Sequence, residues 1–164
     1  MSTRSIEIRY TRSRYTRSIE EYIKAIYILS KRKRVVRVKD IALLLNVKPP
    51  SVTASLNRLL KMGLIEYEKR GYANLTPRGK KIAKKLMKKY NRIREFLINI
   101  LGIQEDIADI EACSMEHFLH EETINKISKL IEFIENCPQG PKFLIHFKEY
   151  IKSGKYPKEC YSTK

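Results

Sequence analysis

Three side chains in one short segment of the sequence could bind a metal ion together. Cys113, Glu116 and His117 are spaced i, i+3 and i+4, so a helix would place all three on one face. A thiolate, a carboxylate and an imidazole could hold a divalent transition metal there and leave positions open for other ligands. The alternative is that Cys113 is a small core residue beside two surface polar groups. His120 could add a ligand or cap the next helix.

Helices are expected on both sides of this segment. A long helix is predicted to begin after Thr76-Pro77 and to stop at Gly102, because apolar residues recur with helical period between them. Helices at about 105–119 and 121–136 follow, and the first of these carries the three candidate ligands. A last helix is expected around 143–152, after a break rich in proline and glycine.

The helices after residue 92 carry more apolar surface than a small three-helix unit can bury alone. Ile124, Ile127 and Ile131 lie on one side of the predicted helix 121–136 and are the residues expected at an interface. Cyclic dimers are the commonest arrangement that buries such a surface, so we expect a homodimer.

The segment from Val35 to Leu75 has the pattern of a winged helix-turn-helix. A helix at about 19–33 precedes a second at 37–46 and a third that opens on Pro49-Pro50-Ser51 and ends at Gly63. An alternating apolar run around Lys69-Arg70-Gly71 predicts a β-hairpin. This order of elements places the third helix in the major groove of DNA. The predicted fold class is therefore mainly α with one small hairpin.

Ile41, Leu44 and Leu45 of the second helix are expected to pack inward, and so is the apolar stripe of the third helix, Val52, Leu56, Leu59 and Leu60. Burial of that stripe leaves small and polar side chains of the third helix facing outward. Small residues at its start allow close approach to base edges, while longer polar residues reach bases or phosphates, and the hairpin tip contacts phosphates. The residues expected to contact DNA are Arg37, Lys48, Pro50, Ser51, Thr53, Ala54, Asn57, Arg58, Lys69 and Arg70.

Positive charge is confined to the same half of the chain. Residues 1–91 hold 24 Lys and Arg against 6 Asp and Glu, whereas residues 92–164 hold 10 against 12. A basic half with a DNA-reading pattern indicates a nucleic-acid partner, against the alternative of a solvated lysine-rich surface. The arginines of residues 1–17 could follow the DNA backbone or belong to an unimportant flexible terminus.

The composition argues against several classes of protein. Hydrophobic content is 43%, which does not suit a mostly disordered chain. No apolar run approaches the ~20 residues of a membrane span, and the N-terminus lacks an apolar signal region. Cys113, Cys137 and Cys160 are too scattered for a disulfide framework, so a cytoplasmic protein is expected. No separate nucleophile, general base or phosphate loop points to catalysis or to a small organic substrate.

Several motifs occur in one order at one spacing, and together they resemble the diphtheria toxin repressor and manganese transport regulator family of metal-activated repressors. The likeness covers about residues 18–137, and its most specific parts are Glu20–Tyr27, Pro50–Thr53, Leu75–Gly79 and Glu111–His117. It implies a basic arm at 1–17, a winged helix-turn-helix domain at 18–78, a linker helix with a metal-binding and dimerisation domain at 79–137, and an extension at 138–164. Because the sequence ends at Lys164, the form without a C-terminal SH3-like domain is expected.

The resemblance also implies a ligand set. A ligand from the first helix joins the later cluster in that family, which by position gives Glu21, Cys113, Glu116 and His117. An alternative for Glu21 is a capping box with Ser18. A thiolate is a soft ligand, so Fe²⁺ is expected first and Mn²⁺ second.

The sequence departs from the family at a second metal position. Relatives hold another ion with histidine and acidic groups, where this chain has Lys24, Tyr90, Arg94 and Asp109. Cations repel a metal ion, so one metal per subunit is expected, with Lys24 or Arg94 supplying fixed positive charge.

The expected function is a metal-dependent transcriptional repressor that binds a palindromic operator as a dimer. One rival is a winged-helix regulator whose DNA binding does not depend on metal. The other is a small metalloenzyme that uses Cys113, Glu116 and His117.

Overall fold

The computed structural model describes residues 15–68 and 71–161, and the chain divides into two compact units, Met1–Lys88 and Lys89–Lys164. The division falls inside a helix, ten residues after the domain boundary expected at residue 78. The predictions made for residues 1–14 and for Lys69 and Arg70 lie outside the described residues.

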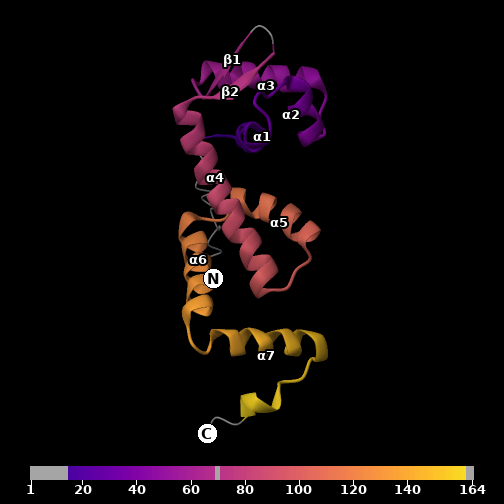
Figure 1. Cartoon of the computed structure of the whole chain (residues 1–164), viewed down its shortest axis with the longest axis vertical. Helices are drawn as coiled ribbons and strands as arrows, with labels where there is room; N and C mark the ends of the chain where they lie inside the picture. The colour runs from indigo at the N-terminus through magenta and orange to yellow at the C-terminus, as the bar shows by residue number, and fades with distance from the viewer. Residues whose placement is uncertain (1–14, 69–70, 162–164) are drawn as a thin grey trace, which may run out of the picture. The chain divides into compact units, whose positions relative to one another are not determined.

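The first unit has the order of elements predicted for a winged helix-turn-helix (Figure 1). Three helices precede a two-stranded antiparallel sheet, and a long helix follows it. They are α1 (Arg17–Arg32), α2 (Val38–Leu45), α3 (Pro49–Lys61), β1 (Ile65–Tyr67), β2 (Ala73–Leu75) and α4 (Pro77–Glu95).

Local signals in the sequence account for the ends of these helices. α2 ends at Asn46, which adopts a left-handed conformation, and α3 begins on Pro49, where a missing N–H costs nothing. Gly63 has a φ of +66° and turns the chain into β1. Thr76 caps α4, since its hydroxyl accepts a hydrogen bond of 3.1 Å from the Gly79 N–H.

The predicted hairpin is present, and in it Ile65 lies opposite Leu75 and Tyr67 opposite Ala73. The chain before α2 adds a short third segment: the Ala73 N–H donates to the Val36 carbonyl at 2.9 Å, and Arg37 bridges to Tyr72. This extra pairing joins the start of the helix-turn-helix to the wing.

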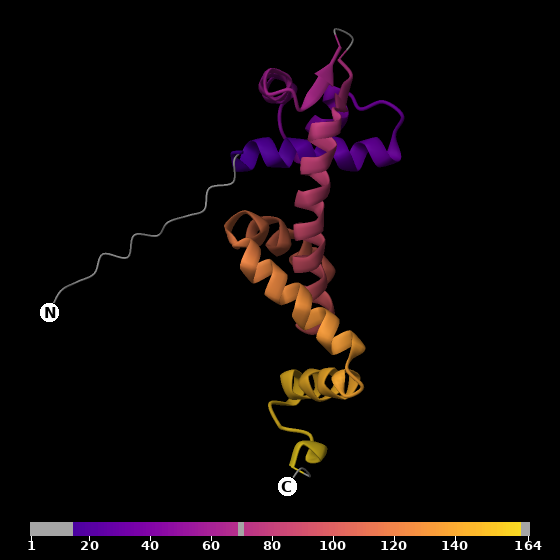
Figure 2. The ribbon, with the colours of Figure 1, turned by 90° about the vertical axis from the view of Figure 1, so that its left-hand side faces the viewer.

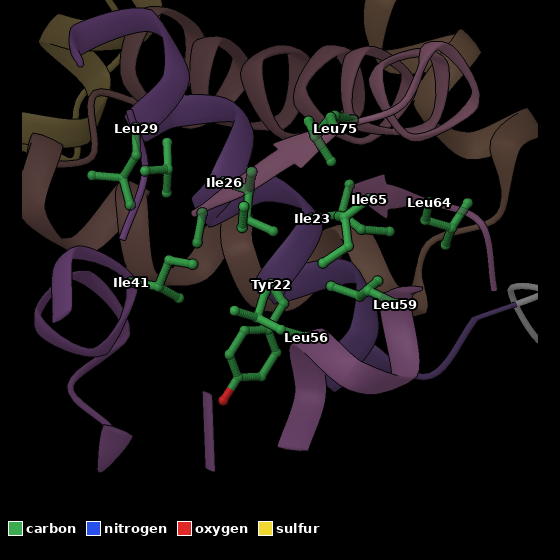
Figure 3. Packing of buried hydrophobic residues seen from close by; sticks show 14 of the residues in the cluster. Tyr22, Ile23, Ile26, Leu29, Ile41, Leu56, Leu59, Leu64, Ile65 and Leu75 are labelled. Atoms are coloured by element: carbon green, nitrogen blue, oxygen red, sulfur yellow. The ribbon is translucent and has the colours of Figure 1, made fainter. Parts of the chain in front are cut away.

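The core of the first unit lies between α1, α2, α3 and the hairpin. Figure 3 shows Ile23 and Ile26 of α1 among side chains from these elements, including Ile41, Leu59 and Ile65. All five are fully buried. Burial of such side chains is the main stabilising contribution to a small domain.

Two residues expected in this core are exposed instead. Leu44 of α2 and Leu60 of α3 were predicted to pack inward, but they are 44% and 42% exposed. The buried residues of α2 are Ile41, as expected, and Ala42.

The second unit consists of helices. Figure 2 shows α6 in orange leading through a sharp turn into α7 in yellow. After the end of α4 the elements are a π-helical segment η1 (Phe96–Ile100), α5 (Glu105–Phe118), α6 (Glu121–Asn136), α7 (Gly140–Ser153) and a 3-10 turn η2 (Lys158–Tyr161). The predicted helices are present, whereas no residue pattern had indicated the π-helical segment.

Two apolar clusters hold the second unit together. One surrounds Ile93 and Leu97 and includes Ala108 and Ala112 of α5, and the other surrounds Ile131 of α6. Within the described residues, every helix is too short or too polar to cross a lipid bilayer.

Candidate metal centre and DNA-binding face

α5 brings two of the predicted ligands together in a buried place. The side chain of Glu116 is 0% exposed and that of His117 is 6% exposed, and His117 Nε2 lies 3.5 Å from Glu116 Oε1. Cys113 is half-buried one turn earlier and is present as a thiol. Ionisable side chains are seldom buried so completely unless they bind a ligand or pair with an opposite charge.

The donor chemistry of this helix fits a divalent transition metal. Glu116 Oε2 and His117 Nε2 are buried atoms, and each is an atom through which a carboxylate or imidazole binds metal. Across the described part of the chain, however, no group of three or more His, Cys, Asp and Glu side chains is already drawn together. Of the predicted metal ligands, the structure therefore brings together Glu116 and His117 on α5.

Glu21 lies on α1 in the first unit, away from any capping role. The predicted capping box of Ser18 and Glu21 is wrong, because the helix starts two residues earlier with Thr16 as its N-cap. Glu21 instead pairs with Arg17 at 3.0 Å, and its side chain is 34% exposed. Such a partly exposed ion pair is weak, so the Glu21 carboxylate can exchange Arg17 for another partner at little cost.

His120 occupies the N-cap position of α6.

Two buried charged residues flank Glu21 on α1. Glu20 is 4% exposed and Lys24 is 7% exposed. The sequence pointed to Lys24 because it replaces a carboxylate of the relatives, but nothing in the helical pattern marked Glu20 as buried.

The second unit contains a polar network at the positions where the sequence argued against a second ion. Tyr90 donates a hydrogen bond of 2.9 Å to Asp109 Oδ1, and the Arg94 Nε–H donates to the same oxygen. Arg94 Nη2 also pairs with Glu105 Oε2 at 2.8 Å. The hydrogen bond from Arg94 lowers the pKa of Asp109, while burial and Asp109 raise the pKa of Tyr90 to about 12.

The predicted DNA-contacting residues of the first unit lie on the outer side of the helix-turn-helix. Thr53 is half-buried, and its hydroxyl donates to the Pro49 carbonyl at 3.2 Å. The other described members are exposed, namely Arg37, Lys48, Pro50, Ser51, Ala54, Asn57 and Arg58. This leaves one face of α3 open to a groove.

Arg37 contacts Tyr72, a residue that was not among the predicted DNA contacts. Its Nη2 donates to the Tyr72 hydroxyl at 3.3 Å, and its guanidinium lies 5.3 Å from the centre of the Tyr72 ring. Tyr72 therefore holds Arg37 against the wing by a hydrogen bond and a cation–π contact. The only sequence signal was its place in the predicted wing.

The residues expected at a dimer interface are partly used within the chain itself. Ile124 and Ile131 are 5% and 0% exposed, and Ile127 is half-buried. Larger apolar side chains of the same unit face outward, including Ile110 at 71% and Phe133 at 65% exposed. A partner copy would therefore reach Ile127 together with residues that the sequence did not single out.

Two family descriptions match most of the chain. The N-terminal DNA binding domain of the iron dependent repressor matches residues 14–73, and the metal binding and dimerisation domain of the same repressor matches residues 76–144.

Two transcriptional regulators match this chain over most of their own length. The HTH-type transcriptional regulator MJ0568 of Methanocaldococcus jannaschii is 36% identical over 118 residues, which cover 71% of this chain and 94% of that protein. The HTH-type transcriptional regulator MntR of Bacillus subtilis is 38% identical over 120 residues, covering 73% of this chain and 84% of that protein.

Solved structures agree with these matches. IdeR of T. acidophilum is 32% identical with a TM-score of 0.64, over 69% of this chain and 53% of that one. The manganese regulator SloR is 30% identical with a TM-score of 0.63, over 70% of this chain and 54% of that one. This chain therefore spans about half the length of those solved chains. It belongs to the iron-dependent repressor family of metal-dependent transcription regulators, which have a DNA-binding and a dimerisation domain and are not enzymes.

Proposed function

We propose that this protein represses metal-homeostasis genes when one divalent metal ion binds each subunit through Glu21, Cys113, Glu116 and His117. Ferrous iron is the first choice of metal, and manganese is the second. The proposed target is a palindromic operator in cytoplasmic DNA, bound by a homodimer.

The observation that carries the metal assignment is the buried pair on α5. Glu116 and His117 lie 3.5 Å apart with almost no side-chain exposure, and Cys113 stands one turn before them. A buried carboxylate next to an imidazole is costly to keep in an apolar surrounding, and a bound cation offsets that cost.

The thiolate of Cys113 favours iron over manganese. Sulfur is a soft donor, whereas Mn²⁺ prefers oxygen ligands, and Zn²⁺, Ni²⁺ and Co²⁺ would also be accepted by this set in vitro. Relatives whose names concern manganese, such as the regulator SloR, keep Mn²⁺ as the second candidate.

DNA binding is assigned to the exposed face of α3 and to the wing. Ser51 and Ala54 offer little steric bulk near base edges, and Asn57 and Arg58 can reach bases or phosphates. Two such faces in a dimer would match the two halves of a palindrome, one helical turn or a multiple of it apart.

The proposed activation joins the two units of the chain. Glu21 belongs to the DNA-binding unit, whereas Cys113, Glu116 and His117 belong to the dimerisation unit. Without a cation the negatively charged ligands repel one another, so the DNA-binding units of the dimer are not held in place. Binding to both half-sites must then also offset the conformational entropy that is lost when the two DNA-binding units become ordered. A bound divalent ion supplies the positive charge that allows the ligands to share one site.

The test is a DNA-binding titration with Fe²⁺, Mn²⁺ and Zn²⁺ on the wild type and on Cys113→Ala. Wild-type affinity should rise roughly 5- to 150-fold with metal, a coupling of about 1–3 kcal/mol. Cys113→Ala should lose most of that response. Cys137→Ala is the matched control, because Cys137 is also a half-buried thiol but lies at the end of α6.

Two results would count against the proposal. DNA binding that does not change when a chelator removes metal would favour a regulator without metal dependence. Equal metal responses in Cys113→Ala and Cys137→Ala would remove Cys113 from the ligand set.

A further inference from the structure

We propose that Tyr90, Arg94, Glu105 and Asp109 form a metal-free tie that fixes the rotation of α5 against α4. Arg94 and Tyr90 would then be positioning residues for the ligands on α5. This inference rests on the proposed function for its metal readout.

The tie connects two turns of one helix with two turns of the other. Tyr90 and Arg94 are four residues apart near the end of α4, and Glu105 and Asp109 are four residues apart at the start of α5. Arg94 pairs with both carboxylates, at 2.8 Å to Glu105, and Tyr90 donates to Asp109 at 2.9 Å. A planar guanidinium that bridges two acids fixes direction as well as distance.

Apolar packing alone specifies the rotation of α5 poorly. The buried apolar residues of this helix are Ala108 and Ala112, whose side chains are single methyl groups. Met115 is only partly buried against the same cluster, and small side chains interlock less than leucine or isoleucine, so apolar packing resists a rotation of α5 only weakly. Polar contacts with strict geometry therefore set the rotation of α5 about its own axis.

Asp109 shares a face with the proposed ligands. Residues 109, 113 and 117 are spaced i, i+4 and i+8, which is one line along a helix. When Arg94 and Tyr90 hold Asp109, the same constraint therefore sets the directions of Cys113 and His117. A helix turned by one residue, about 100°, would break every contact of the tie.

The protonation states suit a permanent contact at neutral pH. The hydrogen bond from Arg94 lowers the pKa of Asp109, and burial raises the pKa of Tyr90 to about 12, so the acid stays charged and the phenol keeps its proton. Asp109 is thereby already committed to Arg94. A second ion could use it only by breaking that pair, so the tie predicts one ion per chain.

The experiment compares Arg94→Leu with Arg92→Leu. Arg92 is on the same helix with similar exposure, but it pairs with Glu95 of its own helix at 2.7 Å and not with α5. The first readout needs no metal: amide hydrogen exchange in the first turns of α5 should quicken in Arg94→Leu and not in Arg92→Leu. The tie is refuted if the two variants protect α5 equally.

The second readout is the metal affinity of the folded variants. Arg94→Leu should weaken metal binding by roughly three- to tenfold, and Arg92→Leu should not weaken it at all. Arg94→Lys should weaken it by less than Arg94→Leu, because an ammonium keeps the positive charge and can pair with one acid, although it cannot replace the planar guanidinium that bridges both. A wild type that binds two ions per chain, or an Arg94→Leu affinity equal to wild type, would overturn the inference. Absence of metal binding by wild type would instead refute the proposed function, and hydrogen exchange would still decide on the tie.

Discussion

Asp40 is held by two neighbours that fix the start of α2. Its carboxylate pairs with Lys33 and accepts a hydrogen bond of 3.0 Å from the Arg37 N–H. The hydrogen bond from Lys33 is the largest cause of its lowered pKa. The Asp40 side chain is only 10% exposed, so this charge is well shielded from solvent. A depressed folded-state pKa adds stability above the unfolded pKa, near 3.8, and this stability is lost as the pH falls through the folded pKa.

Asp40→Asn removes that charge with almost no change of shape. We expect the free energy of unfolding at neutral pH to fall by about 1 kcal/mol, since a hydrogen bond to a charged group is lost. The difference from wild type should shrink as the pH falls through the lowered folded-state pKa of Asp40 and vanish below it, because both side chains are then neutral. Denaturant unfolding at several pH values measures this, with Glu66→Gln, an exposed site on β1, as the control. A difference that persists at low pH would show that charge is not the cause.

Ligand residues could be proposed from the sequence where their chemistry was unusual, whereas the contacts of a residue were hard to predict where several partners compete. Cys113, Glu116 and His117 stood out because few helices carry those three types on one face. The prediction of a Ser18–Glu21 capping box was wrong because the helix already begins at Arg17, and Arg17 forms an ion pair with Glu21. A local motif cannot show which of two nearby partners wins.

Among the elements, the first turn of α4 approaches the hairpin more closely than any side chain would allow. A Cβ atom built on Gly79 would lie 2.1 Å from the Leu64 carbonyl oxygen. The Thr76 cap and the buried Ala83, one turn later, hold this end of the helix in place. Gly79 is therefore required by packing and not by backbone conformation.

Gly79→Ala should destabilise the DNA-binding unit by about 2 kcal/mol or more. Alanine is the better helix former by about 1 kcal/mol, but overpacking against a backbone carbonyl costs more. Lys80→Ala, at the exposed neighbouring position, should change stability by less than about 0.5 kcal/mol. Thermal unfolding followed by circular dichroism compares the two. If Gly79→Ala were as stable as wild type, the close approach would be absent in solution.

Most elements could be predicted because their ends carry strong local signals. Pro49, Gly63 and Pro77 mark boundaries through their own backbone chemistry, so α3 and α4 begin or end where expected. The inward placement of Leu44 and Leu60 was wrong because an apolar residue on a helical stripe is buried only if another element covers it. The π-helical segment Phe96–Ile100 widens a single turn, which leaves no trace in residue types.

For the whole molecule, charge predicts how strongly DNA binding depends on salt. The net charge is +16, and residues 1–91 hold all of the excess. We expect the logarithm of the DNA affinity to fall linearly with the logarithm of salt concentration, with a slope near −0.9 per phosphate contacted. Six to ten contacts would lower affinity by roughly 10³- to 10⁵-fold between 50 and 200 mM salt.

The two variants for this test come from α3 and α2. Arg58→Ala should make the slope shallower by about one if Arg58 binds a phosphate, whereas Leu43→Ala, an exposed apolar site on α2, should leave the slope unchanged. Fluorescence anisotropy at a series of salt concentrations measures both. A slope near zero for wild type would mean that the basic half is only a solvated surface.

The association of subunits was the least accessible property from sequence. Ile124 and Ile131 belong to an apolar stripe, but their own chain already buries them. Periodicity identifies a face that must be covered and does not say whether the cover comes from the same chain or from a second copy. The family match, and not the stripe, supports the homodimer.

The most direct test of the central claim is a crystal structure of the protein grown with Fe²⁺ or Mn²⁺, with anomalous diffraction used to locate the metal. We predict one ion per chain, bound by Cys113, Glu116 and His117 of α5 and by Glu21 of α1. An ion held without Glu21 in every subunit, or no ion beside Glu116 and His117, would contradict the claim that metal joins the DNA-binding unit to the dimerisation unit.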